Sequence, residues 1–243
     1  MDAQTVGQIA QLGVDAATPN TIEINGLQYS DKDVKLVMPP MAECTEVHTL
    51  SGLADLIQAK VEALMPDSVV VVVWSPGRVT CWSKVSDEWG RSMCYAEAVL
   101  PPVTEFAFGQ FMPAEEFLVG LLSKFVQTDD RDYVARMASN MTAEAVTVGG
   151  DDGVTQSVAT RTGVVLAEKT AVRNMVLLAP YRTFREVEQP VSRFLFRVRP
   201  SQKQGEAPWC ALFEADGGAW RLEAMLNIKR KLDDRNLGVT VVA

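Results

Sequence analysis

Histidine is almost absent from this chain, which limits the chemistry available to the protein. His48 is the single histidine among 243 residues. Motifs with two histidines, such as HExxH, are therefore excluded. Any serine- or cysteine-based hydrolytic mechanism would have to use His48 as its base. Two interpretations are open: His48 forms an orienting pair with Glu46 on one side of a strand, or it is a surface histidine just before a helix. We favour the surface histidine.

Closely spaced cysteines are also missing. Cys44, Cys81, Cys94 and Cys210 are scattered without a CxxC pair, and only Cys44 and His48 approach the spacing of metal ligands. The residues between these two alternate as in an extended segment, so the pair would not share a helix face. We expect no metal site, no cofactor, and four cysteines that stay reduced as in a cytosolic protein.

No apolar run is long enough to cross a membrane. The longest, residues 69–74, has six residues, whereas a membrane helix needs about 18–20. The start, Met1-Asp2-Ala3-Gln4, carries an acid and lacks the basic and then apolar layout of a signal peptide. We therefore expect a cytoplasmic protein without membrane contact.

Basic residues are too few for a globally cationic nucleic-acid binder. The chain has 23 Lys and Arg against 31 Asp and Glu, a net charge of −8. The exception is residues 180–203, which contain six basic residues and two glutamates. The net charge of this segment is +4, and that of the remainder is −12. The candidate anion or interface contacts of this segment are Arg182, Arg185, Arg193, Arg197 and Arg199.

The strand predicted at residues 193–199 alternates between two kinds of side chain. Phe194, Phe196 and Val198 fall on one face, and Arg193, Arg197 and Arg199 fall on the other. The phenylalanines are expected in a core. The arginines are a solvated face, partners in ion pairs, a subunit contact or a stripe that binds a polyanion.

The apolar spacing predicts an α+β fold with a largely antiparallel sheet and four to five helices. Helices are predicted at residues 49–65, 113–125, 129–141 and 220–232, with a weaker amphipathic stretch within residues 1–20. Strands are predicted at residues 21–25, 33–38, 69–74, 78–85, 92–100, 145–162, 164–167, 172–179, 194–199, 209–213 and 239–242. Because the run at 69–74 has no polar side, we expect it to be covered on both faces.

The domain organisation follows from this pattern. We expect an N-terminal arm at residues 1–20, whose apolar face docks on the body or on a neighbouring subunit, and a single α+β domain at residues 21–243. A subdivision near residue 143 is the alternative.

Two acidic clusters invite a metal-binding interpretation. Asp151 and Asp152 lie within Gly149–Gly153, but alternating strand residues follow, which favours a hairpin turn over a phosphate loop or a calcium site. Asp129, Asp130 and Asp132 lie at a predicted helix start, where acids are favoured by unpaired amides and by the helix dipole. We favour the structural interpretation for both.

Several segments resemble a known family. They are EVHTLSGL (46–53), VGGDDGVTQ (148–156), LAPYRTF (178–184) with EVEQP (186–190), FLFRVR (194–199) and DGGAWRL (216–222). From about residue 30 to the C-terminus the chain resembles the YfdQ-like family of tailed-phage and prophage proteins, a domain of unknown function. The resemblance implies an intracellular phage-encoded protein, often encoded near recombination or other early genes, and it implies no catalytic residues.

We therefore expect a phage accessory protein in the host cytoplasm that acts by self-assembly and protein interaction rather than by catalysis. Its expected partners are further copies of itself and a host or phage protein. The alternative is an accessory factor in phage DNA recombination or replication that contacts nucleic acid through the arginine-rich strand, although the net charge of −8 opposes strong binding to a phosphate backbone.

Overall fold

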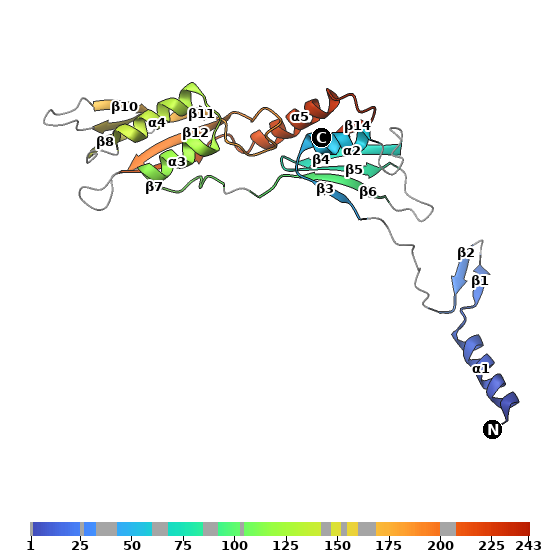
Figure 1. The fold of residues 1–243 in the computed structure, drawn as a ribbon. Coiled ribbons are helices and arrows are strands. Elements are labelled where there is room, and N and C mark those ends of the chain that lie inside the picture. Colours follow the sequence, from blue (N-terminus) through green and yellow to red (C-terminus); the bar gives the residue numbers. More distant parts are fainter. Residues whose placement is uncertain are drawn as a thin grey trace. The chain divides into compact units, whose positions relative to one another are not determined.

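The computed structural model of the chain describes residues 2–24, 27–32, 43–59, 68–84, 92–102, 105–141, 147–151, 155–159, 169–199 and 208–243. Within these ranges the chain forms five helices and four sheets (Figure 1), which confirms the predicted α+β class. The chain divides into two compact units, residues 1–41 and residues 42–243. We call them unit 1 and unit 2.

Unit 1 consists of a helix and a hairpin. α1 (Ala3–Ala17) begins after Asp2, whose carboxylate caps its first turn. β1 (Thr21–Ile24) pairs antiparallel with β2 (Leu27–Ser30). The first strand matches the one predicted at residues 21–25, whereas the strand predicted at 33–38 lies outside the described residues.

A five-stranded sheet forms the first core of unit 2. Its order is β14-β4-β5-β6-β3, with bounds β3 (Thr45–Val47), β4 (Val69–Ser75), β5 (Arg78–Ser83), β6 (Cys94–Val99) and β14 (Thr240–Val242). β4, β5 and β6 form the predicted antiparallel meander, while β3 and β14 run parallel to their neighbours, so this sheet is mixed. The sheet thus combines an early part of the chain with its last strand.

Helices cover one face of this sheet. α2 (Leu50–Gln58) and α5 (Trp220–Asp233) pack there, and Leu53, Val71 and Ile228 are fully buried between them. α2 ends earlier than the predicted helix at 49–65, whose last residues, 60–65, lie outside the described part of the chain.

No helix among the described residues of unit 2 covers the other face of the sheet, contrary to the prediction that the run at 69–74 is covered on both sides. The side chains of β4 alternate between buried Val69, Val71 and Val73 and the less buried Val70, Val72 and Trp74. Trp74 is 59% exposed. The prediction is wrong because α2 and α5 both pack on the first of these faces.

A four-stranded antiparallel sheet forms the second core of unit 2. Its order is β11-β12-β13-β7, with bounds β7 (Met112–Pro113), β11 (Met175–Leu178), β12 (Ser192–Arg199) and β13 (Trp209–Glu214). α3 (Ala114–Lys124) and α4 (Asp129–Met141), at the predicted positions, pack on one face. Phe194 and Phe196 of β12 are fully buried there among phenylalanines of α3 and the preceding loop, as the alternation predicted.

A three-stranded sheet precedes β11 in the chain. It contains β8 (Thr147–Asp151), β9 (Thr155–Ala159) and β10 (Lys169–Arg173) in the order β10-β9-β8. β8, which includes Gly149, Gly150 and Asp151, pairs antiparallel with β9, which supports the hairpin interpretation, although residues 152–154 lie outside the described residues. The strand predicted at 164–167 is also outside them.

Candidate functional sites

A crossing segment, residues 179–192, links the two cores of unit 2. At its start, Tyr181 N donates a hydrogen bond to Lys124 O, 2.9 Å away, at the end of α3. Further along, Thr183 Oγ1 donates to Pro76 O, 2.5 Å away, in the turn between β4 and β5. The segment is therefore attached to both sheets by hydrogen bonds to main-chain oxygens.

The buried side chain of Gln189 fixes the bend of this segment. Its Oε1 accepts hydrogen bonds from Arg182 N and Thr183 N at 3.1 and 3.3 Å. Its Nε2 donates to Phe184 O and Val187 O at 2.9 and 3.1 Å. One amide group thus satisfies four main-chain groups of a segment that forms neither helix nor sheet.

Glu186 of the crossing segment caps α2 from outside the helix. Its carboxylate accepts hydrogen bonds from Leu50 N at 2.6 Å and from Ser51 N at 2.9 Å. Partial burial opposes ionisation, but the hydrogen bonds from Ser51 and Leu50 prevail and hold the pKa of Glu186 below its ordinary value. The negative charge also faces the positive end of the helix dipole.

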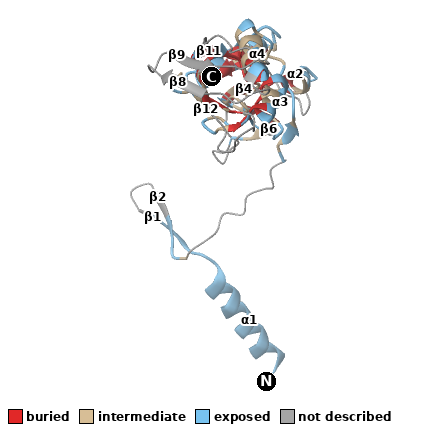
Figure 2. Cartoon of the chain, turned by 90° about the vertical axis from the view of Figure 1, so that its left-hand side faces the viewer, coloured by how far each residue is buried: buried red, intermediate tan, exposed pale blue. Residues whose placement is uncertain are grey.

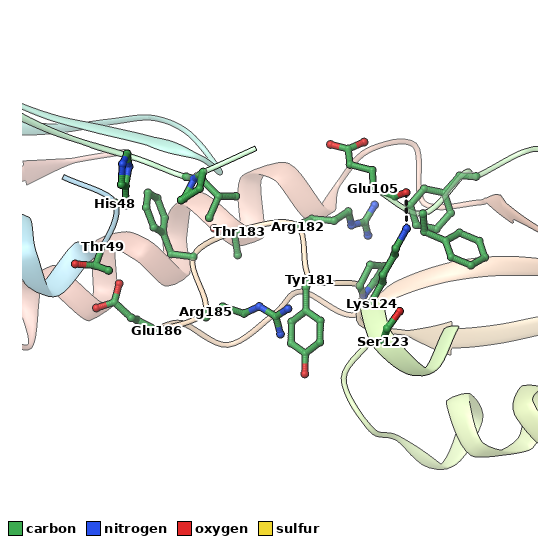
Figure 3. Close-up of a pocket in the computed structure, with 16 residues that line it drawn as sticks. His48, Thr49, Glu105, Ser123, Lys124, Tyr181, Arg182, Thr183, Arg185 and Glu186 are labelled. Atoms are coloured by element: carbon green, nitrogen blue, oxygen red, sulfur yellow. Dashed lines mark hydrogen bonds between the residues drawn. The ribbon is translucent and has the colours of Figure 1, made fainter. Parts of the chain in front are cut away.

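A pocket of about 370 Å³, which we call the junction pocket, lies between the two cores along the crossing segment (Figure 3). Apolar side chains supply most of its walls, among them Leu100, Phe106, Phe108 and Phe184. Its size falls in the range of about 300–1,000 Å³ that is typical of small-molecule sites.

The polar groups of the junction pocket are mainly cationic. Lys124 Nζ donates to Glu105 O at 2.9 Å, a main-chain oxygen rather than a carboxylate. The guanidinium of Arg185 lies 3.3 Å from the centre of the Tyr181 ring (Figure 3). Neither Lys124 nor Arg185 forms an ion pair with any residue of the described ranges. Among the described residues, both cations thus lack an ion-pair partner, although the residue Glu105 also lines the pocket.

Arg182, by contrast, is a structural residue. Its side chain is 10% exposed, forms an ion pair with Glu214, donates to Ser192 Oγ at 2.5 Å and stacks over the Trp220 ring at 4.1 Å. Burial lowers the pKa of Arg182, and the charge of Glu214 opposes this shift. Of the five predicted arginines, this one has its donors engaged within the protein.

The remaining three arginines of the prediction, which we call the arginine row, lie on β12. Arg193 and Arg199 are exposed and Arg197 is partly exposed, on the face opposite Phe194 and Phe196. Arg199 stacks over two aromatic rings of its own chain, those of Phe111 at 4.3 Å and Trp209 at 5.0 Å. The structure therefore separates Arg185, at the junction pocket, from the arginine row on the sheet.

The uncovered side of the five-stranded sheet is apolar at one end. We call this surface the open sheet face, and it comprises Val70, Val72, Trp74, Trp82, Thr240 and Val242. The indole nitrogens of Trp74 and Trp82 both donate to Thr80 Oγ1 at 2.7 Å. Lys84 lies at the border of this face. The ion pair of Arg78 with Glu97 lies on the same face, beside Thr80.

Unit 1 contains a second apolar surface. Val6, Ile9, Ala10, Gly13, Val14 and Ala17 fall within an arc of about 140° around α1, which we call the apolar face of α1. No residue of α1 is buried, as Figure 2 shows by the exposed colour along the whole helix. Ile9, for example, is 56% exposed. Asp15 lies outside this face, and Asp2 precedes the helix as its N-cap.

The pairing of the cysteines differs from the expectation that all four are reduced. Cys44 and Cys94 form a disulfide with a Cα–Cα distance of 5.3 Å, because β3 runs beside β6 and brings them together. The prediction of four reduced cysteines is therefore wrong for this pair. Cys81 and Cys210 are free thiols, and burial raises their pKa values to about 11 and about 12, which makes them poor nucleophiles.

His48 lies at the rim of the junction pocket, just before α2. Its Nδ1 is 3.2 Å from Val99 O and 3.7 Å from the carboxylate of Glu46. The side chain is 59% exposed. Cys44, whose spacing from His48 approaches that of metal ligands, is bonded to Cys94.

The acidic residues at the start of α4 make structural contacts. Asp130 accepts a hydrogen bond from Leu177 N at 2.7 Å and pairs with Arg173, so it joins α4 to the edge strand β11. Asp132 pairs with Arg131. Within the described ranges, no three His, Cys, Asp or Glu side chains converge to hold a metal ion.

No family model, curated protein or solved structure matches the chain. The resemblance to the YfdQ-like family stays a prediction. Among the helices that the structure describes, none is long and apolar enough to span a membrane.

Proposed function

We propose that the protein acts by self-assembly, in which the apolar face of α1 from one copy packs on the open sheet face of a second copy. The observation that carries this proposal is that α1 buries no residue against the described part of unit 1. An isolated helix of about 15 residues is marginal in water, so α1 needs a partner to be stable.

The composition of α1 makes this need stronger. Gly7 and Gly13 lie inside the helix, where each glycine costs about 1 kcal/mol relative to alanine. A Cβ added at either position would meet no atom within 4 Å, so nothing in the chain itself requires these glycines. The described residues of unit 1 supply no cover for α1, and we propose that a second copy supplies it.

The open sheet face fits this role. β4 has the all-apolar composition of a strand covered on both sides, yet Trp74 is 59% exposed and Val70 and Val72 are partly exposed. A helix packed there would complete a layer on each side of the sheet. Both surfaces are mainly apolar, and Lys84 on the sheet side suits Asp15 of α1 and its N-cap Asp2.

A membrane surface is a poorer partner for α1. Helices that lie on anionic membranes carry Lys or Arg on the polar face. The charged residues of this segment are Asp2 and Asp15. These acids would be repelled by an anionic bilayer, which favours a protein partner.

Light scattering of the full chain tests the proposal. Wild type should form an assembly of at least two copies at micromolar concentration, and the variant Ile9→Asp should be monomeric at 26.6 kDa. Trp74→Glu, on the other surface, should give the same result. The matched control Gln8→Glu, on the polar side of α1, should assemble as wild type does. A monomeric wild type, or assembly of Ile9→Asp equal to that of wild type, would refute the proposal.

The second candidate function is the nucleic-acid contact through the arginine row. The exposure of Arg193 and Arg199 favours it, whereas the stacking of Arg199 on its own aromatic rings and the net charge of −8 oppose it. A labelled single-stranded oligonucleotide at low salt tests it. Binding that disappears in the Arg193→Glu and Arg199→Glu double variant, with the assembly unchanged, would favour this candidate over the first.

A further inference from the structure

The junction pocket combines a cation with an aromatic support. Arg185 is held against the Tyr181 ring at 3.3 Å, and Tyr181 is in turn fixed by its main-chain hydrogen bond to the end of α3. Stacking on a ring leaves the edge of a guanidinium, with its forked N–H donors, available to an acceptor. A planar carboxylate is the acceptor that matches this fork.

The charged residues that line the junction pocket are Lys124, Arg182, Arg185, Glu105 and Glu186. Glu186 is already engaged with the first amides of α2, and Arg182 is paired with Glu214. Lys124 and Arg185 form no ion pair within the described part of the chain, although the protein as a whole has an excess of eight acids. An incoming carboxylate would therefore meet two cations that have no ion-pair partner among the described residues.

The walls of the pocket determine the rest of the ligand. Phe106, Phe108, Leu100 and Phe184 line it, and its volume is about 370 Å³. An inorganic anion would leave these walls in contact with water, whereas an aromatic or branched aliphatic body would bury them. We propose that the junction pocket binds an organic carboxylate with an apolar body, whose carboxylate is received by Arg185 and Lys124.

This inference is independent of the assembly proposed above, because the junction pocket shares no residue with α1 or with the open sheet face. Two sources of such a ligand exist: a free aromatic or aliphatic acid, and the terminal carboxylate of a peptide that ends in an apolar residue. They share the chemistry that the pocket recognises.

Calorimetric titration of the full chain tests the inference with 2-naphthoate and its neutral counterpart 2-naphthamide. The carboxylate should bind with a dissociation constant at or below about 1 mM, as expected for a ligand of this size. The amide should bind at least tenfold more weakly. A parallel pair of titrations uses a pentapeptide ending in phenylalanine, as the free acid and as the amide, to identify the source.

Variants locate the binding. Arg185→Gln should weaken 2-naphthoate binding at least tenfold, and Arg185→Lys should retain part of it, because the charge stays and the fork is lost. Arg193→Gln removes an equally exposed arginine outside the pocket and should leave binding unchanged. Circular dichroism checks that each variant is folded. The inference is overturned if neither acid binds, if acid and amide bind equally, or if Arg193→Gln weakens binding as much as Arg185→Gln.

Discussion

Replacing Glu186 should destabilise the protein because this residue caps α2 across the junction between the cores. Glu186→Ala removes two charge-assisted hydrogen bonds, to Leu50 N and Ser51 N. A hydrogen bond to a charged group contributes about 1.5–3 kcal/mol, and the helix dipole adds about 0.3–1 kcal/mol. Since the carboxylate is partly exposed, we expect a total loss of about 2–3 kcal/mol in the free energy of unfolding. Glu186→Gln keeps a carbonyl acceptor and should cost about 1 kcal/mol.

The effect should depend on pH with a definite sign. The folded-state pKa of Glu186 lies below its ordinary value of 4.5. The carboxylate therefore contributes its full stabilisation above about pH 5.5, and the contribution is lost as the pH falls through the folded-state pKa. The difference in unfolding free energy between wild type and Glu186→Gln should be largest at pH 7 and should shrink towards pH 3.

Urea unfolding at both pH values, followed by circular dichroism, measures this difference. Glu188→Gln is the matched control, because Glu188 is an exposed glutamate only two residues further along the chain. The hydrogen bond that Asn227 donates to Glu188 goes to its main-chain oxygen, so the substitution leaves this bond in place. The reasoning fails if the control loses as much stability as Glu186→Gln, or if the Glu186→Gln difference is the same at pH 3 as at pH 7.

Three further predictions concern local interactions. Reduction of the Cys44–Cys94 disulfide should lower the unfolding free energy by up to about 4 kcal/mol, because the bond closes a loop with a sequence separation of 50 residues. A midpoint of urea unfolding that dithiothreitol leaves unchanged would contradict this prediction. The buried thiols of Cys81 and Cys210 should react with iodoacetamide at pH 8 only as fast as the protein opens. Mass spectrometry measures the extent of modification over time, and rapid modification of the native state would contradict the raised pKa values of these thiols. Thr49→Ala should cost about 1 kcal/mol in thermal or urea unfolding, because Thr49 Oγ1 accepts a hydrogen bond from Gly52 N at the start of α2, and a neutral result would show that Glu186 suffices as cap.

Sequence periodicity predicted the elements whose pattern is local. The apolar stripe of residues 113–125 and the acidic start at Asp129 correspond to α3 and α4. The alternation of β12 correctly assigned Phe194 and Phe196 to a core. In these cases the residues that determine the element are neighbours in the chain, so a window of ten to fifteen residues contains the information.

The junction pocket could not be predicted in this way. Its walls come from four separate parts of the chain, and Glu186 reaches the amides of α2 from 135 residues away in sequence. No local pattern indicates that Arg185 and Arg182, only three residues apart, differ so much in burial. That difference depends on Glu214 and Trp220, which reach Arg182 through the fold.

The two errors of sequence interpretation have the same physical origin. The disulfide between Cys44 and Cys94 depends on the parallel pairing of β3 with β6, and parallel pairing has no short-range signal. The strand at 69–74 has the composition of a strand with cover on both sides, but composition does not show whether the second cover is part of the same chain.

The parallel pairing of β14 with β4 has a consequence for how the protein is made. Val241 aligns with Val71, so one edge of β4 stays unpaired until residues 240–242 have been synthesised. The strands of the second core, by contrast, are complete once β13 has been synthesised. Synthesis from the N-terminus therefore lets the second core form first, while the edge of the Val-rich β4 that β14 later pairs with is still unpaired on the nascent chain.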